Sequence, residues 1–491
     1  MDRDVLVLGG GLAGVATALR LQAAGLSTTV LEAHGHAGGC AGYYRRRGFS
    51  FDVGATTLVD FEPGGVGAEL LDAVGMLAPP GEALPGYRAW LPDRTVTLHR
   101  DPAAWHAERL RAFGDTAAHR RFWRLLDGLA GTFWVASRAG VALPMRNPRD
   151  VVRAAGAIGL RGLPAARFLG TTLGDALRRH GLRGDAALVG LLGMLVEDTV
   201  HSTVDDAPLI NSALGITIRG AGLTRAAGGM RGFWRPLVAH YRHLGGDLRT
   251  NQRVLSVERQ PSGFVVHTHR GTFRGRQVVS ALPAATTAAI APPRTAQALA
   301  PYLARDAESL GGAVVVCLGV PEHEVADQEL THHQILESYG TPLGEGNNMF
   351  VSVSAPGDLD SAPAGHRTVM LSTHTELDAW SGLDDAGHAA RRKELGDRLV
   401  GLARQVYPRL AEQPVLFETG TPRAYERFAF RPGGAVGGVR QTVRNSNQHA
   451  VPHQLGERGF WLVGDSTWPG LGTVACVLGS RIVAAGVQAA S

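Results

Sequence analysis

The sequence is short of cysteine, lysine and long apolar runs. Its three cysteines, Cys40, Cys317 and Cys476, lie far apart among 491 residues and form no C-x-x-C pair. This spacing excludes a disulfide framework and a cysteine zinc site, and it favours a reducing compartment. No run of about eighteen apolar residues occurs, so we expect no segment that spans a membrane. A strand is expected from the fourth residue, so we expect no signal or transit peptide and a cytoplasmic protein.

Arginine carries almost all of the positive charge, because Lys393 is the only lysine. Lysine and arginine number 49 against 44 acidic residues, and the net charge of +5 is modest for this length. A bias to arginine is typical of a GC-rich genome, so we expect no nucleic-acid partner. With 44% hydrophobic and 19% charged residues the composition is globular, and the chain is long enough for two domains.

Residues 4–32 have the order of a dinucleotide-binding βαβ unit. An apolar strand over residues 4–8 runs into Gly9-Gly10-Gly11-Leu12-Ala13-Gly14, a G-x-G-x-x-G that opens a helix. Gly9 permits a sharp turn, Gly11 lets backbone N–H groups approach a diphosphate, and Gly14 lets helix and strand pack closely. A second strand over residues 28–31 leads to Glu32, which is placed to accept hydrogen bonds from the ribose of an adenosine.

The surroundings of this motif make it informative. Glycine accounts for 65 of the 491 residues, so chance matches to G-x-G-x-x-G are expected, and a glycine-rich turn that binds nothing is the alternative interpretation. Here the strand, the helix and the acid all stand at the expected distances. The helix N-terminus also offers partial positive charge to phosphates. Together these features favour dinucleotide binding.

A second glycine-rich loop follows Glu32. Its Gly-Gly pair would bring backbone N–H groups close to a ligand, and it leads into Phe49-Ser50-Phe51-Asp52-Val53-Gly54. The basic triplet Arg45–Arg47 either lies near phosphates or forms a solvated turn. The residues of this segment that we assign to the cofactor site are Ala33, Gly38, Gly39, Cys40, Gly54, Ala55 and Thr56.

The order of strand, G-x-G-x-x-G, helix, strand, Glu32, Gly-Gly loop and Phe-Asp-x-Gly resembles the start of the flavin-dependent amine oxidase and carotenoid desaturase superfamily. Residues 39–44 and 48–56 are most similar to carotenoid desaturases and isomerases, and residues 61–65, Phe-Glu-Pro-Gly-Gly, to carotenoid 3,4-desaturases. Many members carry a basic residue after the Gly-Gly pair, where this chain has Cys40.

The resemblance implies two further cofactor segments. Strands are expected over residues 253–258 and 264–269, and Val254 matches the residue whose backbone meets the adenine ring. Residues 459–473 match the second flavin motif, in which Asp465 is suited to accept a hydrogen bond from a ribityl hydroxyl. A final helix over residues 474–487 would direct its N-terminus at the flavin. The cofactor residues of this last motif are Gly464, Asp465, Gly472, Thr473 and Val474.

The implied fold class is α/β: a two-domain FAD-binding fold, Rossmann-like and of the amine oxidase and glutathione reductase type, with an inserted mixed α+β substrate domain. The FAD domain is expected from residues 1–75, 225–300 and 455–491. The substrate domain, which would face a membrane, is expected from residues 76–224 and 301–454. A helix over residues 384–407 and strands over 312–320, 350–354 and 368–372 are expected in the second part.

The implied function is that of an FAD-dependent carotenoid desaturase acting on an acyclic or monocyclic carotenoid, most similar to 3,4-desaturation. The flavin would take a hydride from a carbon beside a polyene in a long apolar tunnel, and oxygen or a quinone would be the final electron acceptor. Isomerisation or saturation of a polyene by the same fold is a close alternative. A flavin amine oxidase and a non-enzymatic escort of prenylated proteins are more distant ones.

The candidate acid–base residues are Glu197, Asp198 and His201, which stand beside an apolar run. A solvated or salt-bridged cluster is the alternative interpretation of these three side chains. His323, His332 and His333 suggest a metal site, but their spacing is not that of helical ligands, so we expect solvated histidines and no metal.

A basic and amphipathic stretch occupies residues 137–184. It holds nine arginines against Asp150 and Asp175, a local charge of +7, with valines, leucines and a phenylalanine between them. Such a stretch suits a membrane interface with arginines at headgroup level, and an ordinary surface layer of helices is the alternative. Because the family resemblance implies a lipid-dissolved substrate, we expect peripheral association with the inner face of the cell membrane.

Overall fold

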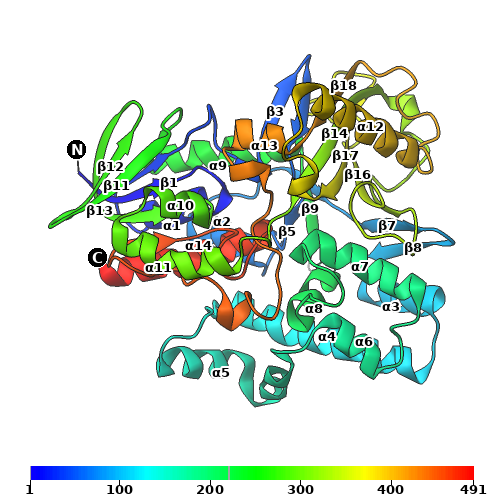
Figure 1. Ribbon diagram of the computed structural model, residues 1–491, viewed down its shortest axis with the longest axis horizontal. Coiled ribbons are helices and arrows are strands. Elements are labelled where there is room, and N and C mark those ends of the chain that lie inside the picture. The colour runs from blue at the N-terminus through cyan, green and yellow to red at the C-terminus, as the bar shows by residue number, and fades with distance from the viewer. Residues whose placement is uncertain (1, 219, 221) are drawn as a thin grey trace.

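Strands that are far apart in the sequence meet in a nucleotide-binding sheet (Figure 1). The computed structural model describes residues 2–218, 220 and 222–491. The strand order is β10-β2-β1-β13-β12-β11, and β19 pairs with β13. The bounds are β1 (Arg3–Leu8), β2 (Thr28–Leu31), β10 (Asp247–Arg249), β11 (Val254–Gln260), β12 (Gly263–Thr268), β13 (Gly271–Ser280) and β19 (Phe460–Leu462). The three chain segments expected to form the FAD domain thus supply this sheet.

Helices cover both faces of this sheet, which explains why β1 is apolar without alternation. Val5 and Val7 pack in one core with the first group of helices, and Leu6 and Leu8 pack in a second core with the other group. The first group is α1 (Leu12–Ala23), α2 (Val66–Ala73), α9 (Gly229–His243) and α14 (Thr473–Ala490); the second is α10 (Ala284–Ile290) and α11 (Pro293–Arg305).

A second sheet, the substrate sheet, has the order β18-β14-β17-β16-β15-β7-β8. Its strands are β7 (Gly86–Leu91), β8 (Arg94–His99), β14 (Gly312–Pro321), β15 (His332–Leu336), β16 (Asn348–Val353), β17 (His366–Thr375) and β18 (Leu416–Gly420). The expected helix over 384–407 is confirmed as α12 (Asp385–Ala403), whose Leu395 and Leu399 pack on the sheet. From about Glu69 to Gly222 the sequence shows no dinucleotide motif and predicts a helical and irregular segment, which is wrong for β7 and β8; β7 pairs in parallel with β15.

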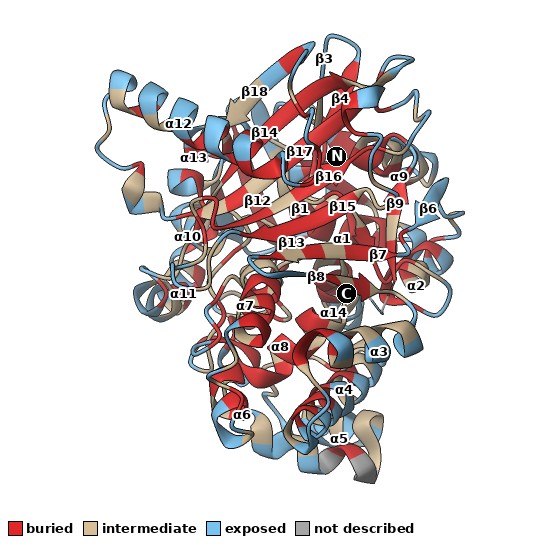
Figure 2. Ribbon diagram, turned by 90° about the vertical axis from the view of Figure 1, so that its right-hand side faces the viewer, coloured by how far each residue is buried: buried red, intermediate tan, exposed pale blue. Residues whose placement is uncertain are grey.

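Below this sheet lies a helical lobe, with α5 at its outer edge (Figure 1). Its elements are α3 (Pro102–Phe113), α4 (Ala117–Arg138), α5 (Pro148–Gly162), η2 (Leu163–Phe168), α6 (Leu173–Arg179), α7 (Ala186–Val200) and α8 (Leu209–Thr217). The side chains of 160, 161 and 163 in the basic stretch lie outside the described residues. Helix α7 is almost wholly apolar because it is buried between α8 and strands β7 and β15. Figure 2 shows most of strands β14 to β17 buried and the outer faces of α5 and α12 exposed.

Short elements connect the two sheets. They are the hairpin β3 (Tyr43–Arg46) and β4 (Phe49–Asp52), the small sheet of β5 (Leu58–Val59), β9 (Leu223–Ala226) and β6 (Gly81–Ala83), helix α13 (Pro422–Ala429), and the 3₁₀ turns η1 (Gly39–Ala41), η3 (Glu322–Glu324), η4 (Leu377–Ala379), η5 (Pro432–Gly434) and η6 (Asn447–His449). Helix α13 packs on η1 and on strands β14 and β18, so it touches the second glycine-rich loop as well as the substrate sheet.

One helix of the described chain, α14, is long and apolar enough to cross a membrane by length and composition. Half of its apolar window is buried, and the helix packs against α1 and α2. A core helix passes the same test, so the finding is weak evidence for a membrane span.

Candidate active site

The predicted diphosphate-binding turn is built from two glycine loops in contact. Gly9 has φ +99°, and a Cβ at Gly14 would lie 2.1 Å from the Gly9 carbonyl oxygen, so both positions require glycine. The Gly38 N–H donates to the Gly10 carbonyl at 2.9 Å. Gly11 is the N-cap of α1, so the helix begins without a capping side chain, which leaves its first N–H groups for an anion.

Glu32 stands at the end of β2, as expected. Its Oε2 accepts a hydrogen bond from the Gly10 N–H at 2.6 Å, and its Oε1 accepts one from the His34 N–H at 2.7 Å. Burial raises the pKa of Glu32. Each carboxyl oxygen keeps a second lone pair for a ribose hydroxyl. The N–H of Gln252 donates to the Glu32 carbonyl at 2.7 Å. Val254, the first residue of β11, therefore lies close to Glu32 in the fold.

The C-terminal motif lies against the first one. Gly464 has φ +111°, and a Cβ there would lie 3.6 Å from Cβ of Ala13. The predicted last helix is confirmed as α14; it begins at Thr473, whose hydroxyl accepts the N–H of Val59 at 3.2 Å. Gly472 is its N-cap, and Val474 packs between two cores. The three cofactor segments therefore meet at one place.

Asp465 has a partner that the sequence did not reveal. Its Oδ2 accepts a hydrogen bond from Nη2 of Arg431 at 2.7 Å, and the side chains of Arg431 and Asp465 are only 12% and 18% exposed. The sequence assigned Asp465 to a ribityl hydroxyl and left Arg431 in the substrate domain. A lone arginine in a loop gives no signal of this pairing.

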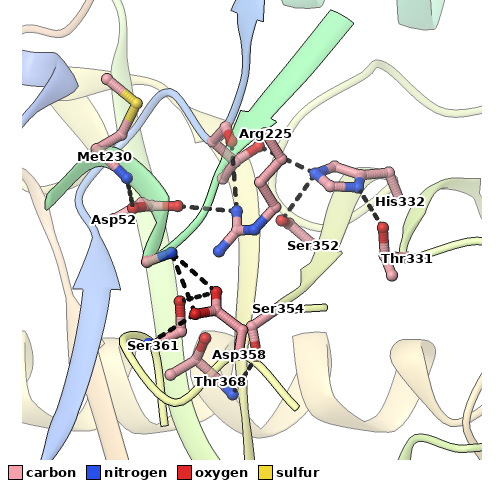
Figure 3. Close-up of polar contacts among 12 residues, drawn as sticks. Asp52, Arg225, Met230, Thr331, His332, Ser352, Ser354, Asp358, Ser361 and Thr368 are labelled. Carbon is pink, nitrogen blue, oxygen red and sulfur yellow. Dashed lines mark hydrogen bonds and ion pairs between the residues drawn. The ribbon is translucent and has the colours of Figure 1, made fainter. Parts of the chain in front are cut away.

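A buried polar network fixes the loop that holds Gly54, Ala55 and Thr56 (Figure 3). Asp52 accepts from Nη1 of Arg225 at 3.0 Å and from the Met230 N–H at 2.8 Å. Nη1 of Arg225 also donates to the Thr56 carbonyl at 3.3 Å. On the other side, the Thr56 hydroxyl lies 3.4 Å from Nε2 of His332. The loop is thus held by Arg225 of β9 on one side and by His332 of the substrate sheet on the other.

His332 and His333 are not solvated, contrary to the sequence interpretation. Both lie on β15 and are fully buried, and burial lowers the pKa of each. His332 stacks on the ring of Tyr87 at 5.0 Å, and Nδ1 of His333 accepts from Trp90 at 3.3 Å. Among the described residues no group of three His, Cys, Asp or Glu side chains is arranged to hold a metal ion.

The predicted acid–base residues lie at the C-terminal end of α7. Oε2 of Glu197 accepts a hydrogen bond from Asn348 at 2.5 Å, and burial raises the pKa of Glu197. His201 has φ +55°, its ring meets His374 edge-to-face at 4.7 Å, and burial lowers its pKa well below the usual value. Both side chains are half-buried, so they are neither fully solvated nor fully enclosed, and their catalytic role stays a prediction. Asp198 lines a small adjoining pocket with Asn348 and His374.

A cavity of about 660 Å³ opens beside Glu197 and His201. Its apolar wall includes Val189, Leu336 and Leu343, and its polar lining includes Tyr339, Glu376 and Arg440. This cavity is therefore not the wholly apolar tunnel that the sequence led us to expect.

Two glycines separate the cavity from the C-terminal cofactor motif. A Cβ at Gly437 would lie 2.2 Å from Cε1 of His201, and a Cβ at Gly438 would lie 2.5 Å from the Asp465 carbonyl oxygen. The backbone at 437–438 thus touches His201 on one side and Asp465 on the other. This close approach places the acid–base candidates next to the predicted flavin site.

The residues present fit a flavin dinucleotide. Two long helices, α1 and α14, begin at glycine N-caps in one region, and a Cβ at Gly472 would meet no atom within 4 Å among the described residues. Glu32 is placed for a ribose, and Asp465 for a polyol. The individual roles assigned to these residues stay predictions.

Comparison with known proteins agrees with this geometry. A family profile described as NAD(P)-binding Rossmann-like domain matches residues 7–74, and one described as flavin containing amine oxidoreductase matches residues 179–487. A chloroplastic prolycopene isomerase of Daucus carota is 23% identical over 96% of this chain and 78% of its own length. A lycopene-forming phytoene desaturase of Pantoea ananas is 24% identical over 99% of each chain.

Solved structures show the same fold. The cyclohexylamine oxidase of Brevibacterium oxydans superposes with a TM-score of 0.62 at 17% identity, covering 100% of this chain and 99% of its own. A wild-type putrescine oxidase bound to putrescine gives a TM-score of 0.60 at 15% identity, covering 100% of this chain and 99% of its own. The mixed fold of a Rossmann-like domain with an inserted substrate domain is confirmed.

We expect Gly11→Val to abolish flavin binding, because the branched side chain would occupy the space between the two glycine loops, where a Cβ already lies 4.0 Å from Cα of Gly39. The measurement is the visible flavin absorption of the purified protein. Gly128→Ala on α4 is the control, since its Cβ would meet no described atom within 4 Å. A fully loaded Gly11→Val protein would contradict the assignment.

Proposed function

The chain belongs to the flavin containing amine oxidoreductase family, in a group like the carotenoid desaturases and isomerases, and from this premise we propose that it is an FAD-dependent carotenoid desaturase. The proposed reaction is 3,4-desaturation of an acyclic or monocyclic carotenoid. The observation that carries the proposal is the contact of Gly437 and Gly438 with His201 and Asp465, which puts a half-buried imidazole beside the flavin motif.

The reaction removes a hydride from one carbon and a proton from its neighbour, and a new double bond forms between them. An oxidised flavin, when bound, accepts the hydride and its two electrons, which pass on to oxygen or a quinone. The protein's tasks are to align the chain-like substrate, to exclude water and to accept the proton. The apolar wall formed by Val189, Leu336 and Leu343 suits the alignment of a polyene.

His201 is the proposed proton acceptor. It is neutral near pH 7 because burial lowers its pKa, and its Nδ1 is buried without a hydrogen-bond partner among the described residues. Glu197 is held by Asn348 and shares the same end of α7 with Asp198. A neutral imidazole has a lone pair that can accept a proton in general base catalysis.

Isomerisation or saturation of the polyene is the second candidate function, because prolycopene isomerases are among the relatives that align over nearly the whole chain. The two functions differ in the product. The amine oxidases among the solved structures share the fold at 17% identity or less. Identity this low supports a common fold but does not indicate that this protein acts on an amine.

We expect the FAD-loaded protein, given lycopene or a hydroxylated derivative in detergent, to produce a pigment that absorbs at longer wavelength, because desaturation extends the conjugated system. The measurement is chromatography with absorption spectra, in air and without oxygen but with a quinone. Unchanged absorption with altered retention would show isomerisation, and a shift to shorter wavelength would show saturation. Either outcome would replace desaturation.

We expect His201→Asn to lower turnover by about 10²–10⁴-fold with unchanged flavin content, because the variant lacks the proton acceptor. Asparagine also tolerates the positive φ of this position. His243→Asn, at an exposed position at the end of α9, is the matched control. Unchanged turnover when Glu197→Gln, Asp198→Asn and His201→Asn are combined would refute the catalytic assignment.

We also propose that the protein works in the cytoplasm, bound peripherally to the inner face of the cell membrane through the helical lobe. Val151 and Val152 on α5 are 51% and 71% exposed, Val135 on α4 is 56% exposed, and the arginines of this stretch suit anionic headgroups.

We expect Val151→Asp with Val152→Asp to weaken binding to anionic lipid vesicles in a sedimentation assay. Leu359→Asp, 71% exposed elsewhere, is the control, and equal binding of all three proteins would contradict the proposal.

A further inference from the structure

Residues 421–438 connect the predicted cofactor motifs, although none of them belongs to a motif. The hydroxyl of Tyr425 donates to the Val53 carbonyl at 2.7 Å, next to the Gly54 loop. Helix α13 packs on η1, which contains Gly39 and Cys40. Arg431 binds Asp465, and Gly438 lies against the backbone of Asp465. One segment thus touches the second glycine loop and the C-terminal motif together.

The segment is folded so that Arg431 turns inward. Gly434 has φ +75° and a Cβ there would lie 2.1 Å from the Pro422 carbonyl oxygen, so the chain doubles back on the start of α13. Nε of Arg431 donates to the Ala435 carbonyl at 3.0 Å, while Nη2 binds Asp465. These bonds use Nε and Nη2, which leaves the Nη1 amino group for a ligand.

The glycine loops themselves supply no full positive charge that could balance a diphosphate. A dinucleotide brings two negative phosphates, and a helix N-terminus offers only about half a unit of positive charge. Cys40 is neutral, since burial raises the pKa of its thiol. Of the exposed triplet Arg45–Arg47, Arg46 pairs with Glu418 and Arg47 donates to the Val415 carbonyl, so these two contact the substrate sheet.

We propose that Arg431 binds the diphosphate of the dinucleotide, with Asp465 holding the guanidinium in place. A planar guanidinium matches phosphate oxygens with parallel N–H groups, and a buried one is already desolvated. The segment 421–438 would then cover the cofactor and connect the Gly39 loop with the Asp465 motif. This inference rests on the FAD cofactor of the proposed function.

The test measures the affinity of the flavin-free protein for two probes, FAD and riboflavin, which lacks the diphosphate. We expect Arg431→Gln to weaken FAD binding by about 10–150-fold, the range of a charge-assisted hydrogen bond, and riboflavin binding by less than about threefold. Arg431→Lys should recover part of the FAD affinity. Arg427, on α13 in the same segment 421–438, has an exposed side chain over Phe428, and Arg427→Gln should bind both probes like the wild type.

The combined variant Arg431→Gln with Asp465→Asn guards against misfolding, because it leaves no unpaired charge where the ion pair was. It should show the same loss of preference for FAD with unchanged circular dichroism. Equal weakening of FAD and riboflavin, or of neither, would overturn the diphosphate assignment. If the wild type binds both probes equally, this inference fails and the flavin site stands. If it binds neither, the cofactor assignment itself fails and the inference with it.

Discussion

The ion pair between Asp52 and Arg225 is the contact on which the site depends. Both side chains are only 5% exposed, and they lie 3.0 Å apart between the first glycine-rich segment and the strand β9 that returns from the helical lobe. Removing one partner of a buried pair leaves an uncompensated charge and costs about 3–5 kcal/mol. Burial alone raises the pKa of Asp52, and the positive charge of Arg225 opposes that rise. Because Arg225 also bonds the Thr56 carbonyl, the pair sets the position of the cofactor loop as well as the joint between the sheets.

A similar arrangement recurs around the site, where three of the predicted cofactor residues contact residues from distant segments. Thr56 meets His332 of the substrate sheet, Thr473 accepts the N–H of Val59, and Asp465 meets Arg431. The polar partners are mostly buried, where hydrogen bonds are stronger and unmade ones are costly. The contact of Thr56 with His332 therefore makes the cofactor loop depend on the position of the substrate sheet.

The parts of this site that could be predicted are those whose signal is local. The turn at Gly9, Gly11 and Gly14 and the strand before it follow from backbone geometry within a few residues, and so does the helix after Gly472. The partners could not be predicted, since nothing near Arg431 or His332 in the sequence states what faces them. His332 is expected to be solvated because its surroundings resemble a loop and its spacing is not that of helical ligands. In the structure β15 is an interior strand, where Ser352 and Thr331 lie within hydrogen-bond distance of the ring nitrogens and Tyr87 stacks on the ring. Strands β7 and β8 were missed because their place in the sheet comes from the pairing of β7 with β15, which lies far along the chain beyond the helical lobe.

A site assembled from distant segments links cofactor binding to the stability of the whole chain. A ligand that binds only the folded state stabilises it by about 2.7 kcal/mol at a concentration of 100 Kd. In a compact local motif that energy would act on one βαβ unit. Here the ligand would touch segments that begin near residues 9, 39, 431 and 464, so the energy would oppose separation of the two sheets. Opening the joint at Asp52 and Arg225 would expose buried charges and release the cofactor in the same step. A flavin bound at these segments would therefore become part of the core that joins them.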